Sequence, residues 1–384
     1  MALRVVLNAT PLLAPRTGVG NYIAELGNAL AQCDEVDLYG FYGYRWRHGP
    51  PAPPAAPARS AAVRSFRELV KPWVPLKRQL RHAQQQLLFG RGLRKYSIEL
   101  YHEPNYVPIR YDVPVVVTVH DLSWIRFPQT HPPDRVRWLN RGLPRAMEQA
   151  AAILVDSTFV RDELAATFPV SRNRIHVAQL GVSGSFRPRS AAQTFATLQA
   201  FDLRHRSYVL SVGTVEPRKN LEHILRAFAL LPPALQNAFP LVIAGARGWR
   251  SAALERELRS LTDMGRVRFV GHISDAELID LYAGAALFVF PSLYEGFGLP
   301  PLEAMACGTP VLVSDRASLP EVVGDAGVML NPLDADATAT QIQSLLEDPQ
   351  LRDQYAQRGL SRAAGFTWAT CAQRTLAAFR AARP

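Results

Sequence analysis

The sequence predicts an α/β fold with two Rossmann-like, doubly wound domains that face a central cleft. Short apolar runs rich in β-branched residues alternate with segments of helical length, which is typical of a parallel sheet covered by helices. This pattern occurs once before residue 182 and again after residue 206. With 384 residues, of which 48% are hydrophobic, the chain is also long enough to form two cores.

The predicted elements follow one another in order along the chain. In the first half, the predicted strands are residues 5–7, 38–42, 115–119 and 153–155, with a helix over residues 21–32. In the second half, the predicted strands are residues 208–212, 241–244, 267–270, 287–290 and 311–313. Residues 182–206 contain Pro188 and a polar stretch, so we expect an irregular linker there. We therefore place the domains at residues 1–185 and 186–365, followed by a last helical segment over residues 366–384.

Composition narrows the classes of protein and partner. A formal net charge of +10 favours nucleic acid, an anionic membrane or an anionic small molecule as a partner. We find no recognised nucleic-acid-binding motif and expect no nucleic acid. Three cysteines, Cys33, Cys307 and Cys371, lack metal-ligand spacing, which fits a reducing cytosol. No cleavable leader and no run of about 18 apolar residues are present, so we expect a soluble protein or one held at a membrane face.

A basic stretch over residues 59–95 interleaves arginines and lysines with apolar residues, after a proline-rich segment that we expect to be a surface loop. One interpretation is a solvated helix pair whose apolar side packs on the first domain. The other is an amphipathic surface that docks on anionic lipid. The sequence leaves both open.

The strongest local signal lies at residues 291–306, directly after a predicted strand. Its glycine-bearing turn opens a helix, so unpaired amides beside Gly296, Phe297, Gly298 and Leu299 would favour a phosphate. Glu295 and Glu303 bracket the turn, and a carboxylate can accept hydrogen bonds from sugar hydroxyls. The alternative is an ordinary helix entry with surface glutamates.

Residues 211–220 form a second strand-to-helix turn, with Gly213 and Thr214 followed by Arg218 and Lys219. These two cations could neutralise a diphosphate leaving group, although each could also be a surface charge. Because both motifs follow strands of one predicted sheet, we expect them to line one solvent-facing cleft.

The first half offers weaker signals. Gly18, Val19 and Gly20 open a helix where backbone could approach a phosphate or sugar. A dinucleotide fingerprint fails, since Ile23 stands where a third glycine is needed, which argues against a nicotinamide oxidoreductase. His120, followed by Asp121, ends a buried strand and is predicted to point into the cleft, and no second acid or base is expected to accompany it in the first domain's motif. Asp334 precedes a helical segment and is predicted to cap it rather than to bind metal. We predict no metal and no cofactor.

In this order and spacing, the motifs resemble those of the family 4 retaining glycosyltransferases of GT-B fold, especially bacterial mannosyl and hexosyl transferases that build O-antigens and exopolysaccharides. The resemblance covers nearly the whole chain. It is carried by residues 17–20, 101–106, 119–122, 156–159, 213–220 and 269–273 and by the pair Glu295 and Glu303.

The resemblance implies an acceptor-side first domain, a donor-binding second domain and a last helix that crosses back to the first domain. It implies that Glu295 contacts donor-sugar hydroxyls and Glu303 the ribose, and that Arg218 and Lys219 contact the diphosphate. By the same resemblance, the backbone at residues 296–299 contacts the sugar or phosphate, the backbone at His272 and Ile273 holds the base, and His120 contacts the transferred sugar.

The implied activity is metal-independent hexosyl transfer with retention, from a nucleotide-diphosphate sugar to a lipid-linked saccharide at the cytoplasmic face of the inner membrane. Gly213 and Thr214 replace a common family pattern that has an arginine, a form familiar in the mannosyltransferase-like subset, so a GDP-linked donor is favoured. A UDP-linked donor is the alternative. A non-catalytic nucleotide-sugar-binding protein is the rival from another class, and a phosphorylase or epimerase of the same architecture is the nearer rival.

Overall fold

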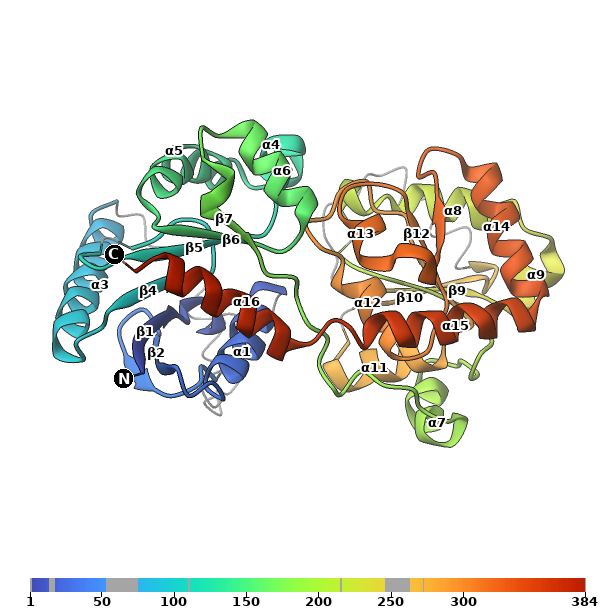
Figure 1. Ribbon diagram of the computed structural model, residues 1–384. Helices are drawn as coiled ribbons and strands as arrows, with labels where there is room; N and C mark the ends of the chain where they lie inside the picture. Colours follow the sequence, from blue (N-terminus) through green and yellow to red (C-terminus); the bar gives the residue numbers. More distant parts are fainter. Residues whose placement is uncertain are drawn as a thin grey trace.

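A computed structural model describes residues 2–13, 18–52, 75–109, 111–214, 216–245, 263–271 and 273–383. Figure 1 shows two α/β units side by side, each built around one sheet. Among the described residues, no helix is long and apolar enough to cross a membrane.

The first sheet has seven strands. Their spatial order is β3 (Trp46–His48), β2 (Val36–Phe41), β1 (Leu3–Asn8), β4 (Leu100–Glu103), β5 (Val115–Val119), β6 (Ala152–Val155) and β7 (Ile175–Val177). Only β3 runs antiparallel to its neighbour. The described helices of this unit are α1 (Gly18–Leu30), α3 (Pro75–Lys95), α4 (Ser123–Arg126), α5 (Pro133–Gln149) and α6 (Thr158–Thr167).

Alternation of side chains along the strands builds two apolar layers in this unit. Val5 and Leu7 of β1 pack with α1, whereas Val6 faces the opposite side, where α3, α5 and α6 pack. In the described part of the basic stretch, Phe89 and Leu93 of α3 are buried in this second layer. The described part of α3 therefore packs on the first domain, whereas residues 59–74 lie outside the described residues and lipid docking remains a prediction.

The second sheet has six strands, all parallel. Their order is β10 (Val267–Gly271), β9 (Leu241–Ala244), β8 (Val209–Val212), β11 (Leu287–Phe290), β12 (Val311–Ser314) and β13 (Val328–Leu330). The described helices of this unit are α7 (Ala191–Ala200), α8 (Leu221–Ala229), α9 (Pro233–Ala238), α11 (Asp275–Gly284), α12 (Leu299–Ala306), α13 (Leu319–Val323), α14 (Ala335–Glu347) and α15 (Pro349–Ala363). The predicted two-sheet α/β fold is confirmed.

Two local expectations have different outcomes. Asp334 caps α14 by accepting a hydrogen bond of 2.9 Å from the amide of Ala337, as predicted. The expected irregular linker over residues 182–206 is wrong in part, because α7 lies within it. Ser190 and Gln193 form a reciprocal capping box that starts this helix, and the polar character of the segment concealed it.

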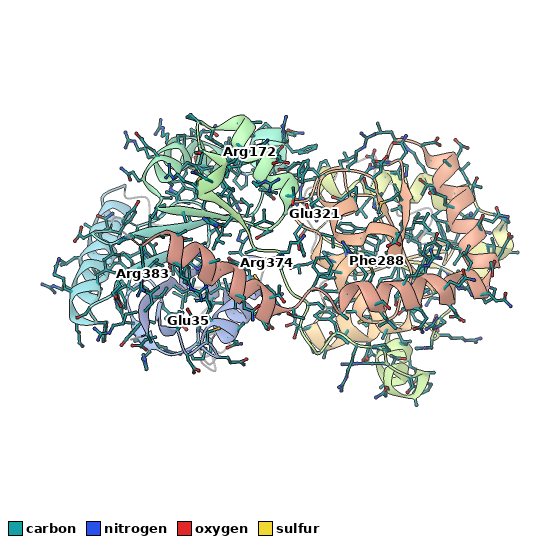
Figure 2. All side chains as sticks on the ribbon, viewed as in Figure 1. Glu35, Arg172, Phe288, Glu321, Arg374 and Arg383 are labelled. Atoms are coloured by element: carbon teal, nitrogen blue, oxygen red, sulfur yellow. The ribbon has the colours of Figure 1, made fainter. Side chains whose placement is uncertain are left out.

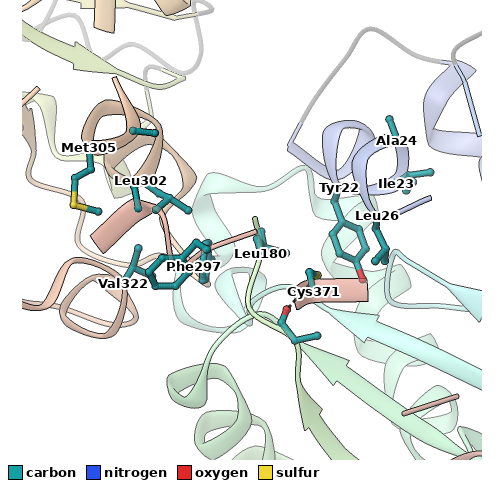
Figure 3. Packing of buried hydrophobic residues seen from close by; sticks show 14 of the residues in the cluster. Tyr22, Ile23, Ala24, Leu26, Leu180, Phe297, Leu302, Met305, Val322 and Cys371 are labelled. Carbon is teal, nitrogen blue, oxygen red and sulfur yellow. Dashed lines mark hydrogen bonds between the residues drawn. The ribbon is translucent and has the colours of Figure 1, made fainter. Parts of the chain in front are cut away.

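The last helix, α16 (Trp368–Ala381), lies against the first unit, although α15 packs on the second (Figure 1). It packs along α1, and Arg380 forms an ion pair of 2.6 Å with Glu35. A single apolar cluster joins the two units, in which Tyr22 and Cys371 of the first are connected through Leu180 to Phe297 of the second (Figure 3). The two units are therefore joined by packed apolar side chains.

Candidate active site

The two charged motifs of the second half lie side by side because of the strand order. β8 and β11 are neighbours in the sheet. From β8 the chain adds β9 and β10 on one side, and from β11 it adds β12 and β13 on the other, so the direction of winding reverses between them. Ligands of doubly wound sheets bind at such a reversal, beyond the carboxyl ends of the strands. Gly213 to Lys219 follow β8, and residues 291–299 follow β11. Both motifs therefore lie at the same edge of one sheet, as the sequence predicts.

Glu295 connects the two motifs through ion pairs. Its carboxylate lies 2.6 Å from Nζ of Lys219 and 3.1 Å from Nη1 of Arg218, and Ser292 donates a further hydrogen bond of 2.6 Å. Arg218 also pairs with Glu216 at 2.6 Å. Only 10% of the Glu295 side chain and 13% of each cation are exposed, so the expectation of a solvent-facing cleft is wrong for these residues.

Charge pairing decides the protonation of this cluster. Burial on its own would raise the pKa of Glu295, but Lys219 and then Arg218 lower the pKa to about 2. Burial likewise opposes the charge of Arg218, yet Glu295 and Glu216 raise its pKa further above the usual range. The motif thus holds Arg218 and Lys219 in contact with the carboxylates of Glu216 and Glu295.

Donor groups without protein acceptors surround this cluster. Within the described part of the chain, the amides of Gly296, Phe297, Gly298 and Leu299 donate to no acceptor, and Nε of Arg218 is also unpartnered. Pro300 and Pro301 carry no amide hydrogen, and no side chain caps α12. The φ of Gly298, 114°, lies in the region that favours glycine. Such a row of free amides is suited to phosphate oxygens.

Gly296 also brings the two halves of the chain into contact. A Cβ atom at this position would lie 1.9 Å from the backbone oxygen of His120, so only glycine allows the approach. The Gly296 carbonyl accepts a hydrogen bond of 2.7 Å from the Ser157 hydroxyl, which belongs to the first domain. The motif after β11 and the histidine after β5 thus form one site.

His120 is held through both of its ring nitrogens. Nδ1 lies 2.7 Å from a carboxylate oxygen of Asp156, and Nε2 lies 2.9 Å from the carbonyl oxygen of Pro104. Burial on its own would lower the pKa of His120, but Asp156 and then Pro104 raise the pKa above its usual range. A carbonyl only accepts hydrogen bonds, so Nε2 carries a proton and the doubly protonated ring is favoured.

The prediction that no second acid accompanies His120 is therefore wrong. Asp156 follows β6, the strand next to β5, and the parallel register places both residues at the same edge. The contact joins residues 36 positions apart in the chain, which no local spacing reveals. Neither ring nitrogen is free in this arrangement.

A small cavity of about 90 Å³ lies between α1 and α12. Asn21 and Glu25 line it from the first domain, and Asp275 and Glu303 from the second. Burial raises the pKa of Glu303 to about 8, although a hydrogen bond of 3.1 Å from the Tyr282 hydroxyl offsets part of the effect. Glu303 is thus placed between the domains in a largely protonated state at neutral pH.

Comparisons with known proteins decide the family. A family model described as glycosyl transferases group 1 matches residues 200–362, and one described as glycosyltransferase family 4 matches residues 16–185. The O-antigen chain mannosyltransferase B of Escherichia coli is 37% identical over 384 residues, covering 98% of this chain and 100% of that relative. The chain belongs to the family 4 glycosyltransferases.

Solved structures support the same fold. Sucrose-phosphate synthase from Thermosynechococcus elongatus matches with a TM-score of 0.73 at 22% identity, covering 98% of both chains. Anabaena HepE, solved in complex with UDP-glucose, matches with a TM-score of 0.69 at 17% identity, covering 98% of this chain and 99% of that one. The architecture of this glycosyltransferase is therefore GT-B, as predicted.

The other predicted site residues of the glycosyltransferase are distributed around the cleft. Gly18, Val19 and Gly20 form the first turn of α1, whose Asn21 lines the small cavity. Thr214 is exposed beyond β8, next to Gly213, and Ile273 packs on the apolar cluster between β10 and α11. His272 lies outside the described residues. No group of three His, Cys, Asp or Glu residues suited to a metal ion occurs among those that are described.

Two contacts between the domains of the glycosyltransferase had no signal in the sequence. The Glu321 carboxylate, from α13, accepts hydrogen bonds of 2.8 and 3.3 Å from the amides of Thr158 and Phe159 at the start of α6. Figure 2 shows Glu321 between the two units. The hydroxyl of Tyr294 bonds to Glu163 and accepts from the Leu122 amide at 2.8 Å. These contacts hold the two units together around the site.

Proposed function

We propose that this glycosyltransferase transfers a mannosyl group, with retention and without a metal ion, from a GDP-linked donor to a lipid-linked saccharide during O-antigen synthesis. The end-to-end relationship to the E. coli O-antigen chain mannosyltransferase is the observation that carries the substrate class. Gly213 and Thr214, in place of the common arginine pattern, support the GDP donor. The lipid-linked acceptor places the reaction at the cytoplasmic face of the inner membrane.

The donor diphosphate fits the cluster after β8 and β11. Arg218 and Lys219 supply two positive charges, and the free amides of residues 296–299 supply aligned donors. A bound diphosphate would take over the cations now paired with Glu295, whose carboxylate would then be released to accept hydrogen bonds from sugar hydroxyls. The site can thus provide the leaving-group charge stabilisation for which other enzymes use a divalent ion.

The reaction step follows from this placement. The bond from the anomeric carbon to the diphosphate oxygen breaks, and the acceptor oxygen forms its bond to the same face of that carbon. The acceptor proton passes to the departing diphosphate, so atoms and charges balance without a protein nucleophile. Arg218 and Lys219 stabilise the negative charge that grows on the leaving group, which is the largest contribution we assign to the protein.

The remaining residues orient the donor. Glu303, largely protonated before the donor binds, can both donate to and accept from ribose hydroxyls in the cavity between α1 and α12. His120, bridged to Asp156, would contact the transferred sugar once Nε2 leaves the Pro104 carbonyl. The proposed role of His120 therefore requires a local movement of residues 104–106 or of its ring.

The first experiment is thermal unfolding with GDP, UDP, ADP and their common hexose conjugates, with a chelator present throughout. A ligand that binds only the native state stabilises it, by about 2.7 kcal/mol at 100 times the Kd. Selective stabilisation by GDP species, followed by transfer of mannose with retained anomeric configuration, is the expected result. Selective stabilisation by UDP species would overturn the donor, and a strict metal requirement would overturn the charge argument.

A further inference from the structure

A separate groove on the first domain has the features of a phosphate-binding site. It is open to solvent, with a volume of about 1040 Å³ between α5 and the loop that follows β4. Figure 1 shows α5 on the upper part of this domain. The predicted donor contacts lie elsewhere, so none of the residues already assigned to the nucleotide sugar lines this groove.

Three arginines form one wall of the groove. Arg137, Arg141 and Arg145 follow one another at intervals of four residues, so they lie on the same face of α5. Arg137 pairs with Asp134, one turn earlier. Arg141 and Arg145 are exposed and make no ion pair with any carboxylate in the described ranges. Two uncompensated guanidinium groups one turn apart provide bidentate donors of the kind that bind phosphate.

The opposite wall carries apolar side chains, one unused polar group and Asp112, whose carboxylate is paired with Arg94 at 3.9 Å. Val107 and Ile109 line it, and the Trp138 ring, 44% exposed, lies at the arginine side. Tyr111 lines the groove, and its hydroxyl is buried without a hydrogen-bond partner among the described residues. A buried hydroxyl without a partner is destabilising unless a ligand completes its hydrogen bonding. The groove therefore combines anion donors with surface for a hydrocarbon or sugar face.

The loop that forms the apolar wall also holds the active site. Its first residue, Pro104, provides the carbonyl that bonds to His120, and the Tyr106 hydroxyl donates to Asp121 at 3.1 Å. Val107, the next residue, packs against Gly142 of α5, where a Cβ atom would lie 2.9 Å from it. A ligand in the groove would thus contact the segment that sets the position of His120.

We propose that this groove binds the phosphate group through which a lipid carries the acceptor saccharide. Arg141 and Arg145 bind the phosphate oxygens, the Tyr111 hydroxyl donates to one of them, and Trp138 covers the adjoining hydrocarbon or sugar. The inference rests on the proposed function, because it assigns the acceptor of that same reaction. An acceptor phosphate is favoured over a membrane phospholipid because one loop borders both the groove and the reacting centre.

The test compares two acceptors that share one saccharide, of which one is a short-chain alkyl diphosphate ester and the other an alkyl glycoside without phosphate. In the Arg141→Gln/Arg145→Gln double variant, KM for the phosphorylated acceptor is expected to rise about 10-fold or more relative to KM for the glycoside. Tyr111→Phe is expected to produce a smaller rise without a loss of Tm, because its hydroxyl has no protein partner to lose. Arg358→Gln, at an exposed arginine of α15, is the matched control.

Other results would overturn the assignment. Unchanged KM values in the double variant, or equal rises for both acceptors, would show that the groove does not recognise the phosphate. Loss of binding to anionic phospholipid vesicles with an unchanged KM for the short phosphorylated acceptor would assign the groove to the membrane instead. If the wild type transfers to neither acceptor, the proposed function fails, and calorimetric binding of the alkyl diphosphate to wild type and double variant decides the groove separately.

Discussion

The two sides of the cleft hold their polar groups in different states of hydrogen bonding. On the second-domain side, the amides of residues 296–299 and Nε of Arg218 have no protein acceptor in the described chain. On the first-domain side, both ring nitrogens of His120 are bonded, to Asp156 and to Pro104. The donor side is therefore prepared for an anion, whereas His120 must break a hydrogen bond before it can contact a sugar.

The largest effect is expected on the second-domain side, where Arg218 and Lys219 are already held together before a ligand binds. In Lys219→Met, the leaving diphosphate loses one of two cations, and the transfer rate is expected to fall about 10²- to 10³-fold. Glu295 keeps Arg218 and Ser292 as partners, so the fold should persist. Steady-state transfer assays measure the loss, and Arg358→Met, at an exposed arginine of α15, is the control. A loss of less than about fivefold would remove Lys219 from the diphosphate site.

Glu295 is better tested by glutamine than by alanine. Removing one partner of a buried ion pair leaves the other unpaired, which costs about 3 to 5 kcal/mol and could confuse loss of activity with unfolding. Glu295→Gln keeps the volume and can still accept from Ser292. This substitution is therefore the companion to Lys219→Met on the donor side.

The second-largest effect is expected on the first-domain side, from a substitution of Asp156. In Asp156→Asn, burial is left to dominate, so the pKa of His120 should fall below its usual range and the ring should be neutral at pH 7. We expect a 10- to 100-fold slower transfer. Histidine NMR titration follows the ring directly.

The stability that protonated His120 contributes decreases as pH rises. Because the folded-state pKa of His120 is raised, its contribution to stability is complete below about pH 6.5 and is lost as pH rises through the folded value. The wild type should lose this stability and Asp156→Asn should not. If the free energy of unfolding changes with pH in the same way for the wild type and Asp156→Asn between pH 6 and 9, the pairing of His120 with Asp156 is contradicted.

A smaller effect is expected where the two sides are joined. Glu321→Ala removes the carboxylate that caps α6 from the other domain, at a cost of about 1 kcal/mol. The domains should separate more often, with a severalfold lower transfer rate and a larger radius of gyration in solution scattering. Glu347→Ala, at an exposed site on α14, is the control. An unchanged radius and rate would limit Glu321 to local capping.

The smallest effect concerns Glu303. Its folded-state pKa of about 8 exceeds the ordinary 4.5, so its stabilising protonation is complete below pH 4.5 and is lost as pH rises through 8. Glu303→Gln removes this dependence and should unfold at a higher temperature than the wild type at pH 9, with little difference at pH 4.5. Donor affinity should fall severalfold in calorimetry. If the unfolding temperature depends on pH equally in both proteins, the raised pKa of Glu303 is contradicted.

The order of apolar runs was sufficient to predict most of the sheet but not all of it. The strand candidates of the second half appear as β8 to β12, whereas β3, β4, β7 and β13 were not predicted. β4 contains His102 and Glu103, which are fully buried but polar, so no apolar run marks it. Asn8 and Tyr101 satisfy Glu103 by hydrogen bonds of 2.8 and 2.5 Å, and those partners come from the tertiary structure. β3, β7 and β13 each span only three residues, too few for a periodic signal.

The sequence by itself determined where the two charged motifs of the second half meet, because each motif is continuous and directly follows a buried strand, whereas their binding of a donor stays a proposal. It determined Glu295, Arg218 and Lys219 as a group, since adjacent parallel strands bring their carboxyl ends to one edge. Only the tertiary structure decided that Asp156 holds His120, that Glu321 caps α6, and that Arg141, Arg145 and Tyr111 share a groove. Those contacts join segments far apart in the chain, and their geometry depends on how sheets, helices and loops pack rather than on any local spacing.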